Sequence, residues 1–161
     1  PHFQGRVLPP VPTARGTWIG LTSGHTLGHL FRSQLEGIAF QYAEWADRIA
    51  QLGGTQPRQA RVLGGGARSP LWNQIKADVL GIDWVPTSRE ECGVLGDALI
   101  AAAATGHITD PAETAGEWQA TRAPFRPDPA RHHRYRSLFE AYREMTVQLG
   151  PVFDRLAGGD V

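Results

Sequence analysis

Three consecutive glycines at residues 64–66 constrain this chain more than any other feature of its sequence. They follow Arg61, Val62 and Leu63, which predict a brief buried strand. Ser69 and Pro70 come next and predict the start of a helix, because serine is a favoured N-cap and proline fits the first helical position. The glycines therefore form a tight turn between a strand and a helix.

The pattern of apolar residues predicts a strand and a long helix before this turn. Residues 17–22 are β-branched, aromatic or aliphatic, which favours a short strand. Apolar residues spaced three and four apart then lie on one stripe of a helix that ends at Gly53 and Gly54. We expect the whole stripe to face the core; it consists of Leu27, Phe31, Leu35, Ile38, Tyr42, Trp45, Ile49 and Leu52.

Further elements follow the turn. We expect a helix over residues 70–80, a strand over residues 82–85 that Pro86 halts, and a helix that begins at a capping box formed by Ser88 and Glu91. Strands and helices thus alternate along the chain. This order predicts an α/β sheet with at least some parallel pairing.

The 161 residues are enough for one domain with a sizeable core. Prolines and glycines divide the chain into an extended lead-in at residues 1–15, an α/β core at 16–106, a connection at 107–128 and a C-terminal helix at 129–157. We expect that helix to bend or break at Gly150 and Pro151. The first residue is not methionine, and we expect the numbering to begin inside a longer chain.

Composition narrows the class of protein. The hydrophobic fraction of 41% and the charged fraction of 20% are those of a globular protein rather than a disordered chain. The net charge is zero and the arginines are scattered, which argues against a nucleic-acid partner. No apolar run is long enough to span a membrane. Cys92 is the only cysteine, which excludes an internal disulfide, and we expect a cytoplasmic protein.

The glycine turn is the best candidate for a binding site. Amides without intrahelical partners and the positive end of the helix dipole converge there, and glycines let a ligand approach the backbone. These features predict a site for a phosphate or a flat ring, with a ligand-free turn as the alternative. A Walker loop is excluded, because the only lysine, Lys76, lies inside the expected helix. A dinucleotide fold stays a weaker alternative, since Ser69 replaces the third glycine of its pattern.

Other polar residues give weaker signals. His25 and His29 stand four apart and could clamp a metal, but no third ligand accompanies them, and a hydrogen-bonded or solvated pair is the preferred interpretation. Three acids lie on otherwise apolar helices and could orient a substrate or a magnesium-bound water. Acids in such positions are more often packing or surface residues; they are Glu36, Asp78 and Asp97.

Two groups of residues carry a longer, ordered pattern: first 15–22, 25–32 and 35–40, then 64–74, 77–78 and 95–98. The first group resembles the second signature of the FGGY family of carbohydrate kinases. The second group resembles the adenosine segment of the same family, most closely in xylulokinases. The resemblance covers nearly the whole chain. It implies two actin-like ATPase domains, ribonuclease H-like in fold, of which this chain forms the C-terminal portion of the second, with a short mixed sheet flanked by long helices.

The resemblance also implies a site and its cofactors. Gly65, Gly66 and Ala67 would offer their backbone to the adenosine and α-phosphate of ATP, and Asn73 would place a side-chain amide near the base. ATP and Mg²⁺ are the implied cofactors and a sugar is the implied substrate. The catalytic base is implied to lie upstream, so no catalytic residue is assigned in this chain. The missing N-terminal kinase domain is an implied partner, and an uncovered sheet edge favours a homo-oligomer.

The sequence thus predicts the ATP-binding part of a kinase that phosphorylates xylulose or a related ketopentose or polyol, with the isolated piece inactive. A non-catalytic nucleotide-binding or oligomerisation module is the first alternative. A nicotinamide-binding domain is a weaker one. The gene upstream of Pro1 separates the kinase from the module, because a contiguous sugar-binding domain would contradict the module.

Overall fold

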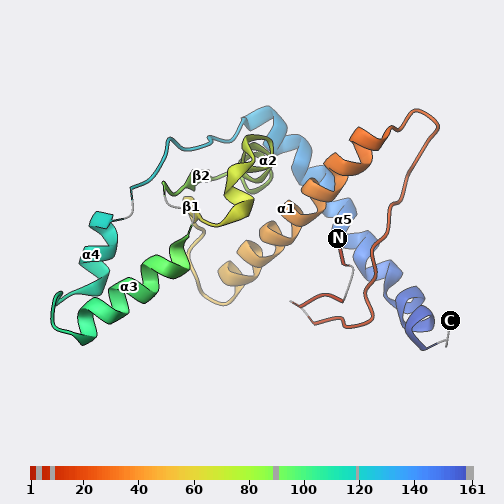
Figure 1. The fold of residues 1–161 in the computed structure, drawn as a ribbon. Coiled ribbons are helices and arrows are strands. Elements are labelled where there is room, and N and C mark those ends of the chain that lie inside the picture. Colours follow the sequence, from red (N-terminus) through yellow and green to blue (C-terminus); the bar gives the residue numbers. More distant parts are fainter. Residues whose placement is uncertain (3–4, 8–9, 89–90, 119, 159–161) are drawn as a thin grey trace.

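The computed structural model describes residues 1–2, 5–7, 10–88, 91–118 and 120–158. Helices dominate the described chain, and two short strands lie in its middle (Figure 1). The order of elements is α1 (Leu27–Gln51), β1 (Gln59–Val62), the 3-10 helix η1 (Gly65–Arg68), α2 (Pro70–Leu80), β2 (Asp83–Pro86), α3 (Cys92–Ala104), α4 (Pro111–Trp118) and α5 (Pro129–Gly158).

A parallel β-α-β unit forms the centre of the fold. β1 pairs with β2 in parallel register, from Gln59 opposite Asp83 to Val62 opposite Pro86, and α2 makes the crossover between them. On the other edge of β2, isolated antiparallel bridges join Trp84 to Phe125 and extend the sheet toward the connection before α5. The predicted α/β fold class with a short mixed sheet and long helices is confirmed, and so are the strand before the glycine turn and the strand after α2.

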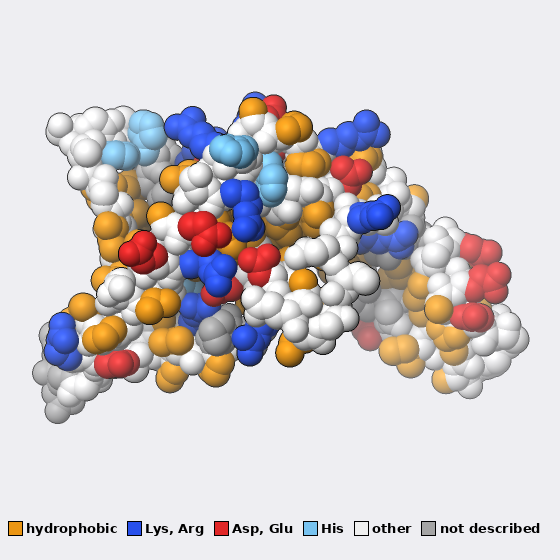
Figure 2. All heavy atoms as spheres, turned by 180° about the vertical axis from the view of Figure 1, so that it is seen from behind, with side chains coloured by type: hydrophobic (Ala, Val, Ile, Leu, Met, Phe, Trp, Pro, Cys, Tyr) orange, Lys and Arg blue, Asp and Glu red, His pale blue; other side chains and the backbone are white. Residues whose placement is uncertain are grey.

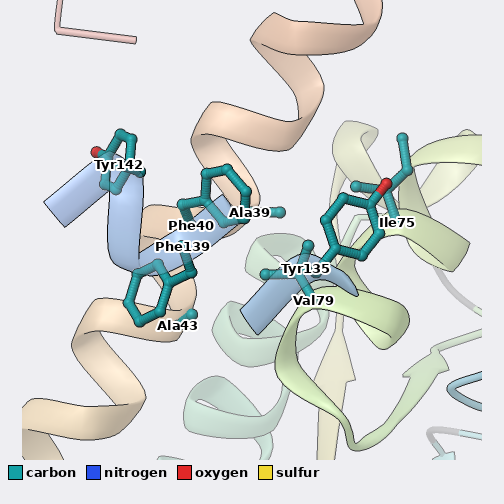
Figure 3. Packing of buried hydrophobic residues seen from close by; sticks show 8 residues of the cluster. All are labelled: Ala39, Phe40, Ala43, Ile75, Val79, Tyr135, Phe139 and Tyr142. Carbon is teal, nitrogen blue, oxygen red and sulfur yellow. The ribbon is translucent and has the colours of Figure 1, made fainter. Parts of the chain in front are cut away.

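The hydrophobic core lies where α1, α2 and α5 meet. Phe40 of α1 contacts Phe139 and Tyr142 of α5, with ring centroids 5.8 and 5.3 Å apart. Small residues on α1 let α2 approach its backbone closely, and the buried face of α2 fills the space between the long helices (Figure 3). The cluster consists of Ala39, Phe40, Ala43, Ile75, Val79, Tyr135, Phe139 and Tyr142.

The long apolar stripe of α1 is only partly covered, which corrects the expectation that all eight residues face the core. Its ends are exposed, with Leu27 at 80% and Leu52 at 76% exposure, while the middle of the stripe is half-buried. The reason is length, because α1 has 25 residues and the crossing helix α2 has 11. α2 therefore covers the centre of α1 and leaves both ends open.

The expected strand at residues 17–22 is wrong. The segment runs into α1 as an exposed loop that extends away from the packed helices (Figure 1). A strand requires a hydrogen-bonded neighbour, and none of the described residues pairs with this segment. β-propensity alone therefore does not create a strand at this position.

Helix starts follow the sequence signals in part. Ser69 caps α2, since its Oγ accepts from the amide of Trp72 at 3.3 Å, and Asp128 caps α5 through the amide of Arg131 at 2.9 Å. The capping box expected at Ser88 is wrong, because Glu91 is the N-cap of α3. α5 continues through Gly150 and Pro151, so of the bend or break expected there the break is absent. No helix in the described part of the chain combines the length and apolarity needed to cross a membrane.

Candidate functional site

The glycine turn leaves β1 through a backbone conformation that only glycine adopts without strain. Gly64 has φ 81° and ψ −176°, a region closed to residues with a Cβ atom. The chain then forms the single turn η1, and the amide of Ala67 donates to the carbonyl oxygen of Gly64 at 3.0 Å. The turn is thus a compact, internally bonded corner between β1 and α2.

Two amides of the turn are available to a ligand. Among the described residues, no acceptor receives a hydrogen bond from the backbone N–H of Gly65 or Gly66. A Cβ atom at Gly65 would meet nothing within 4 Å, so this side of the turn is open. A Cβ atom at Gly66 would lie 3.2 Å from the ring of Trp72, so that side is packed. An anion or a flat ring can therefore approach the turn at Gly65.

Ala67 and Asn73 hold the turn in place. Asn73 lies in the second turn of α2 and is only 1% exposed. Its Nδ2 donates to the carbonyl oxygen of Ala67 at 2.8 Å, and its Oδ1 has no hydrogen-bond partner among the described residues. The amide of Ala67 is already used within the turn. Both residues therefore stabilise the turn through hydrogen bonds within the protein. Their contact with a nucleotide stays a prediction.

Lys76 lies beneath the turn, a position that sequence reasoning did not recognise. The side chain is 2% exposed, and its Nζ stands 3.6 Å from the centroid of the Trp72 ring. The rings of Trp84 and Tyr42 lie at 5.3 and 5.6 Å from the same atom. Burial lowers the pKa of Lys76 to about 8. The spacing of Trp72 and Lys76, four residues apart on one helix face, is the signal that could have predicted this cation-π contact.

The two histidines at the start of α1 are hydrogen-bonded, as preferred from the sequence. The Nδ1 of His25 accepts from the amide of Thr22 at 2.9 Å, and the Nδ1 of His29 accepts from the amide of Thr26 at 3.1 Å. The described residues contain no group of three His, Cys, Asp or Glu side chains placed to hold a metal ion. The histidines therefore stabilise the entry into α1.

Two of the three candidate acids are structural. The Oε1 of Glu36 accepts from the hydroxyl of Tyr135 at 2.8 Å and from Arg32 at 2.8 Å. Burial and the bond to Glu36 raise the pKa of Tyr135 to about 12. Asp78 accepts from the side chain of Gln74 at 2.8 Å and from the amide of Asp128 at 2.9 Å, and thereby fixes the start of α5 to α2. The third acid, Asp97, is exposed on α3.

Solved structures of carbohydrate kinases share this fold. The gluconate kinase of Lactobacillus acidophilus superposes with a TM-score of 0.79 at 24% identity, over 91% of this chain and 30% of that chain. The xylulose kinase of Rhodospirillum rubrum superposes with a TM-score of 0.75 at 29% identity, over 89% of this chain and 29% of that chain. The fold is thus the actin-like ATPase fold of sugar kinases.

Sequence comparison gives the family. Residues 1–105 match the C-terminal domain of the FGGY family of carbohydrate kinases, and the chain belongs to this family. The glycerol kinase of Bordetella parapertussis is 37% identical over 162 residues, which cover 99% of this chain and 31% of that protein. The erythritol kinase of Brucella abortus is 36% identical over 148 residues, which cover 91% of this chain and 28% of that protein. The chain spans between 24% and 31% of the length of the curated relatives it matches.

Proposed function

We propose that this chain provides the nucleotide-binding side of an ATP-dependent carbohydrate kinase, in which a phosphoryl group passes from ATP to a hydroxyl group of a sugar or polyol. The observation that carries the proposal is the pair of amides at Gly65 and Gly66, which have no hydrogen-bond acceptor among the residues that the structure describes. Backbone N–H groups in this position are suited to nucleotide phosphates. Membership of the FGGY family supports the same assignment.

Each residue of the turn has a distinct role in this proposal. Gly65 and Gly66 donate to the α-phosphate and leave room for the adenosine. Ala67 and Asn73 hold the turn rigid through their mutual hydrogen bond. We place the base of the nucleotide beside Asn73. Lys76 places positive charge below the turn, which favours an anionic ligand above it. None of these residues abstracts the sugar proton, so the catalytic base belongs to the part of the kinase outside this chain.

Magnesium is part of the proposal through the nucleotide. Mg²⁺ takes oxygen ligands from one or two carboxylates and from the phosphates of ATP, and it supplies charge neutralisation during transfer. The acids Glu36 and Asp78 are engaged in hydrogen bonds that hold α1 and α5. The third candidate, Asp97, belongs to no group of three His, Cys, Asp or Glu side chains that could hold a metal ion in the described part of the chain. We therefore assign the protein ligands of Mg²⁺ to the upstream part of the kinase.

The sugar substrate is proposed only as a class. The relatives and structural neighbours are named as kinases of glycerol, erythritol, xylulose and gluconate. Small polyols and ketopentoses are the candidates, with xylulose among them. A coupled assay of ADP formation by the full-length parent with glycerol, erythritol and xylulose tests this choice. Turnover on none of the three would contradict the proposed substrate class.

The partners and location follow from the same proposal. We propose an N-terminal kinase domain as the partner that completes the cleft, a cytoplasmic location, and self-association through uncovered apolar surface. Leu27 and Phe31 at the exposed end of α1 are 80% and 58% exposed and offer such a surface. Sedimentation of the full-length parent tests self-association, and a monomer at all concentrations would contradict it.

Calorimetry with ADP tests the nucleotide site. Valine at Gly65 occupies open space and leaves the packing intact, and Gly65 is not in the left-handed region. We expect Gly65→Val in the full-length parent to weaken ADP binding at least tenfold, or about 1.4 kcal/mol. Gly93→Val is the matched control, because Gly93 is exposed on α3 and its Cβ would also meet nothing within 4 Å. Equal ADP affinity in both variants would remove the turn from the site.

A further inference from the structure

A second cavity lies away from the glycine turn, between the start of α1 and the start of α5. It measures about 480 Å³, and its lining includes His25, His29, Arg32, Glu36, Arg131 and Arg134. None of its lining residues belongs to the glycine turn or to α2. We propose that this cavity binds a small multivalent anion of the phosphate-monoester class, at a site separate from the proposed nucleotide site.

Each of the two histidines uses its Nδ1 atom in a hydrogen bond to the backbone and therefore presents an N–H donor on its other ring nitrogen. The Nδ1 of each ring accepts a backbone N–H, from Thr22 for His25 and from Thr26 for His29. A neutral imidazole carries one proton, so the proton of each ring lies on Nε2. The rings stand edge to face with centroids 5.6 Å apart, and both residues line the cavity. Two neighbouring N–H donors at one cavity favour an acceptor-only ligand such as a phosphate.

The charges around the cavity favour an anion as well. Glu36 is the only carboxylate among the lining residues, and Arg32 neutralises it at 2.8 Å. Arg131 makes a longer ion pair with Asp78 at 3.4 Å and keeps 61% of its side chain exposed. Arg134 makes no ion pair with any described residue. An uncompensated guanidinium at a cavity is suited to bidentate recognition of phosphate oxygens.

The cavity is partly preorganised. The Nη2 of Arg32 donates to the hydroxyl of Tyr135 at 2.9 Å, and this hydroxyl donates in turn to Glu36. These bonds join α1 to α5 across one wall of the cavity. Figure 2 shows arginine and histidine side chains gathered along the upper part of one face of the molecule. A ligand there meets one wall already held by these hydrogen bonds, together with the exposed side chains of Arg131 and Arg134.

Titration calorimetry of the full-length parent with inorganic phosphate at low ionic strength tests the proposal. We expect Arg134→Gln to weaken phosphate binding at least fivefold. Arg155→Gln is the matched control, because Arg155 is exposed near the end of the same helix and outside the cavity, and we expect it to leave phosphate binding unchanged. Equal phosphate affinity in Arg134→Gln and Arg155→Gln, or no phosphate binding by the wild type, would overturn the proposal.

A cross-test separates this site from the nucleotide site. Arg134→Gln should keep the ADP affinity of the wild type, and Gly65→Val should keep its phosphate affinity. Loss of phosphate binding in Gly65→Val would place the phosphate at the glycine turn and overturn the second site. Loss of ADP binding in Arg134→Gln would show that the cavity and the glycine turn form one site, and would also overturn the proposal of a separate anion site. Melting curves of each variant confirm that the fold is retained.

Discussion

The Nδ2 of Asn73 donates a hydrogen bond to the carbonyl oxygen of Ala67 at 2.8 Å, so α2 holds the end of the glycine turn that precedes it. The side chain is almost fully buried, and among the residues that the structure describes it is the donor to the carbonyl oxygen of Ala67. The turn and the helix therefore behave as one unit. A change at Asn73 therefore alters the support of the turn in the proposed nucleotide site.

Asn73→Ala should destabilise the protein and loosen the turn. Removing a buried donor leaves the carbonyl oxygen of Ala67 unpaired, and such a loss costs about 1–3 kcal/mol. We expect the free energy of unfolding in urea to fall by about that amount. Gln148→Ala, an exposed change on α5, is the control and should stay within about 0.5 kcal/mol of the wild type. Equal urea midpoints for Asn73→Ala and Gln148→Ala would show that the hydrogen bond between Asn73 and Ala67 contributes nothing to stability.

Gly81→Ala should be among the most damaging small substitutions in this chain. Gly81 ends α2 with φ 69°, and an added Cβ would lie 2.6 to 2.9 Å from the ring of His132. Gly53 has φ 86° but open space around its Cβ position, so Gly53→Ala carries the backbone strain alone. We expect Gly53→Ala to cost about 1 kcal/mol and Gly81→Ala clearly more. Similar costs in urea unfolding would mean that His132 moves aside freely.

The sequence predicts the centre of this fold well because its signals there are local. Ser69 and Pro70 mark the start of α2 through a cap and a restricted φ angle, which depend on neighbouring residues alone. The glycines between β1 and α2 mark a tight turn for the same reason, since Gly64 adopts a conformation that other residues avoid. Local chemistry fixes these elements whatever surrounds them.

Features that depend on distant contacts could not be predicted. Residues 17–22 have strand composition, but no described neighbour pairs with them. Leu27 and Leu52 follow helical spacing, yet α2 is too short to cover them. The cation-π cage of Lys76 needs Trp84 from β2, which no spacing rule connects to it. The brace by Asn73 likewise appears only once α2 is placed against the turn.

Tyr135→Phe should weaken the contact between α1 and α5. The hydroxyl of Tyr135 donates to Glu36 and accepts from Arg32 in a half-buried network. We expect the free energy of unfolding to fall by about 1–3 kcal/mol, since both charged partners lose a partly buried hydrogen bond. A double-mutant cycle with Glu36→Ala, which removes the acceptor of the hydroxyl, isolates the pair, and we expect a coupling energy of about 0.5–3 kcal/mol. Additive effects of the two changes would contradict the network.

Lys76→Met should remove a pH dependence of stability that the wild type shows in alkali. The pKa of Lys76 is lowered by burial to about 8, against 10.5 for the ordinary group, so the unfolded chain binds the proton more strongly between these two values. Below about pH 8 both states carry the charge and the burial penalty is present in full. As the pH rises toward 10.5, the folded state loses the proton first and the penalty disappears.

Wild-type stability should therefore rise relative to Lys76→Met across this window, as measured by urea unfolding at several pH values. The comparison cancels every other titrating group, since the two proteins share them all. Parallel pH profiles would show that the rings of Trp72, Trp84 and Tyr42 fully replace the lost hydration of the ammonium group.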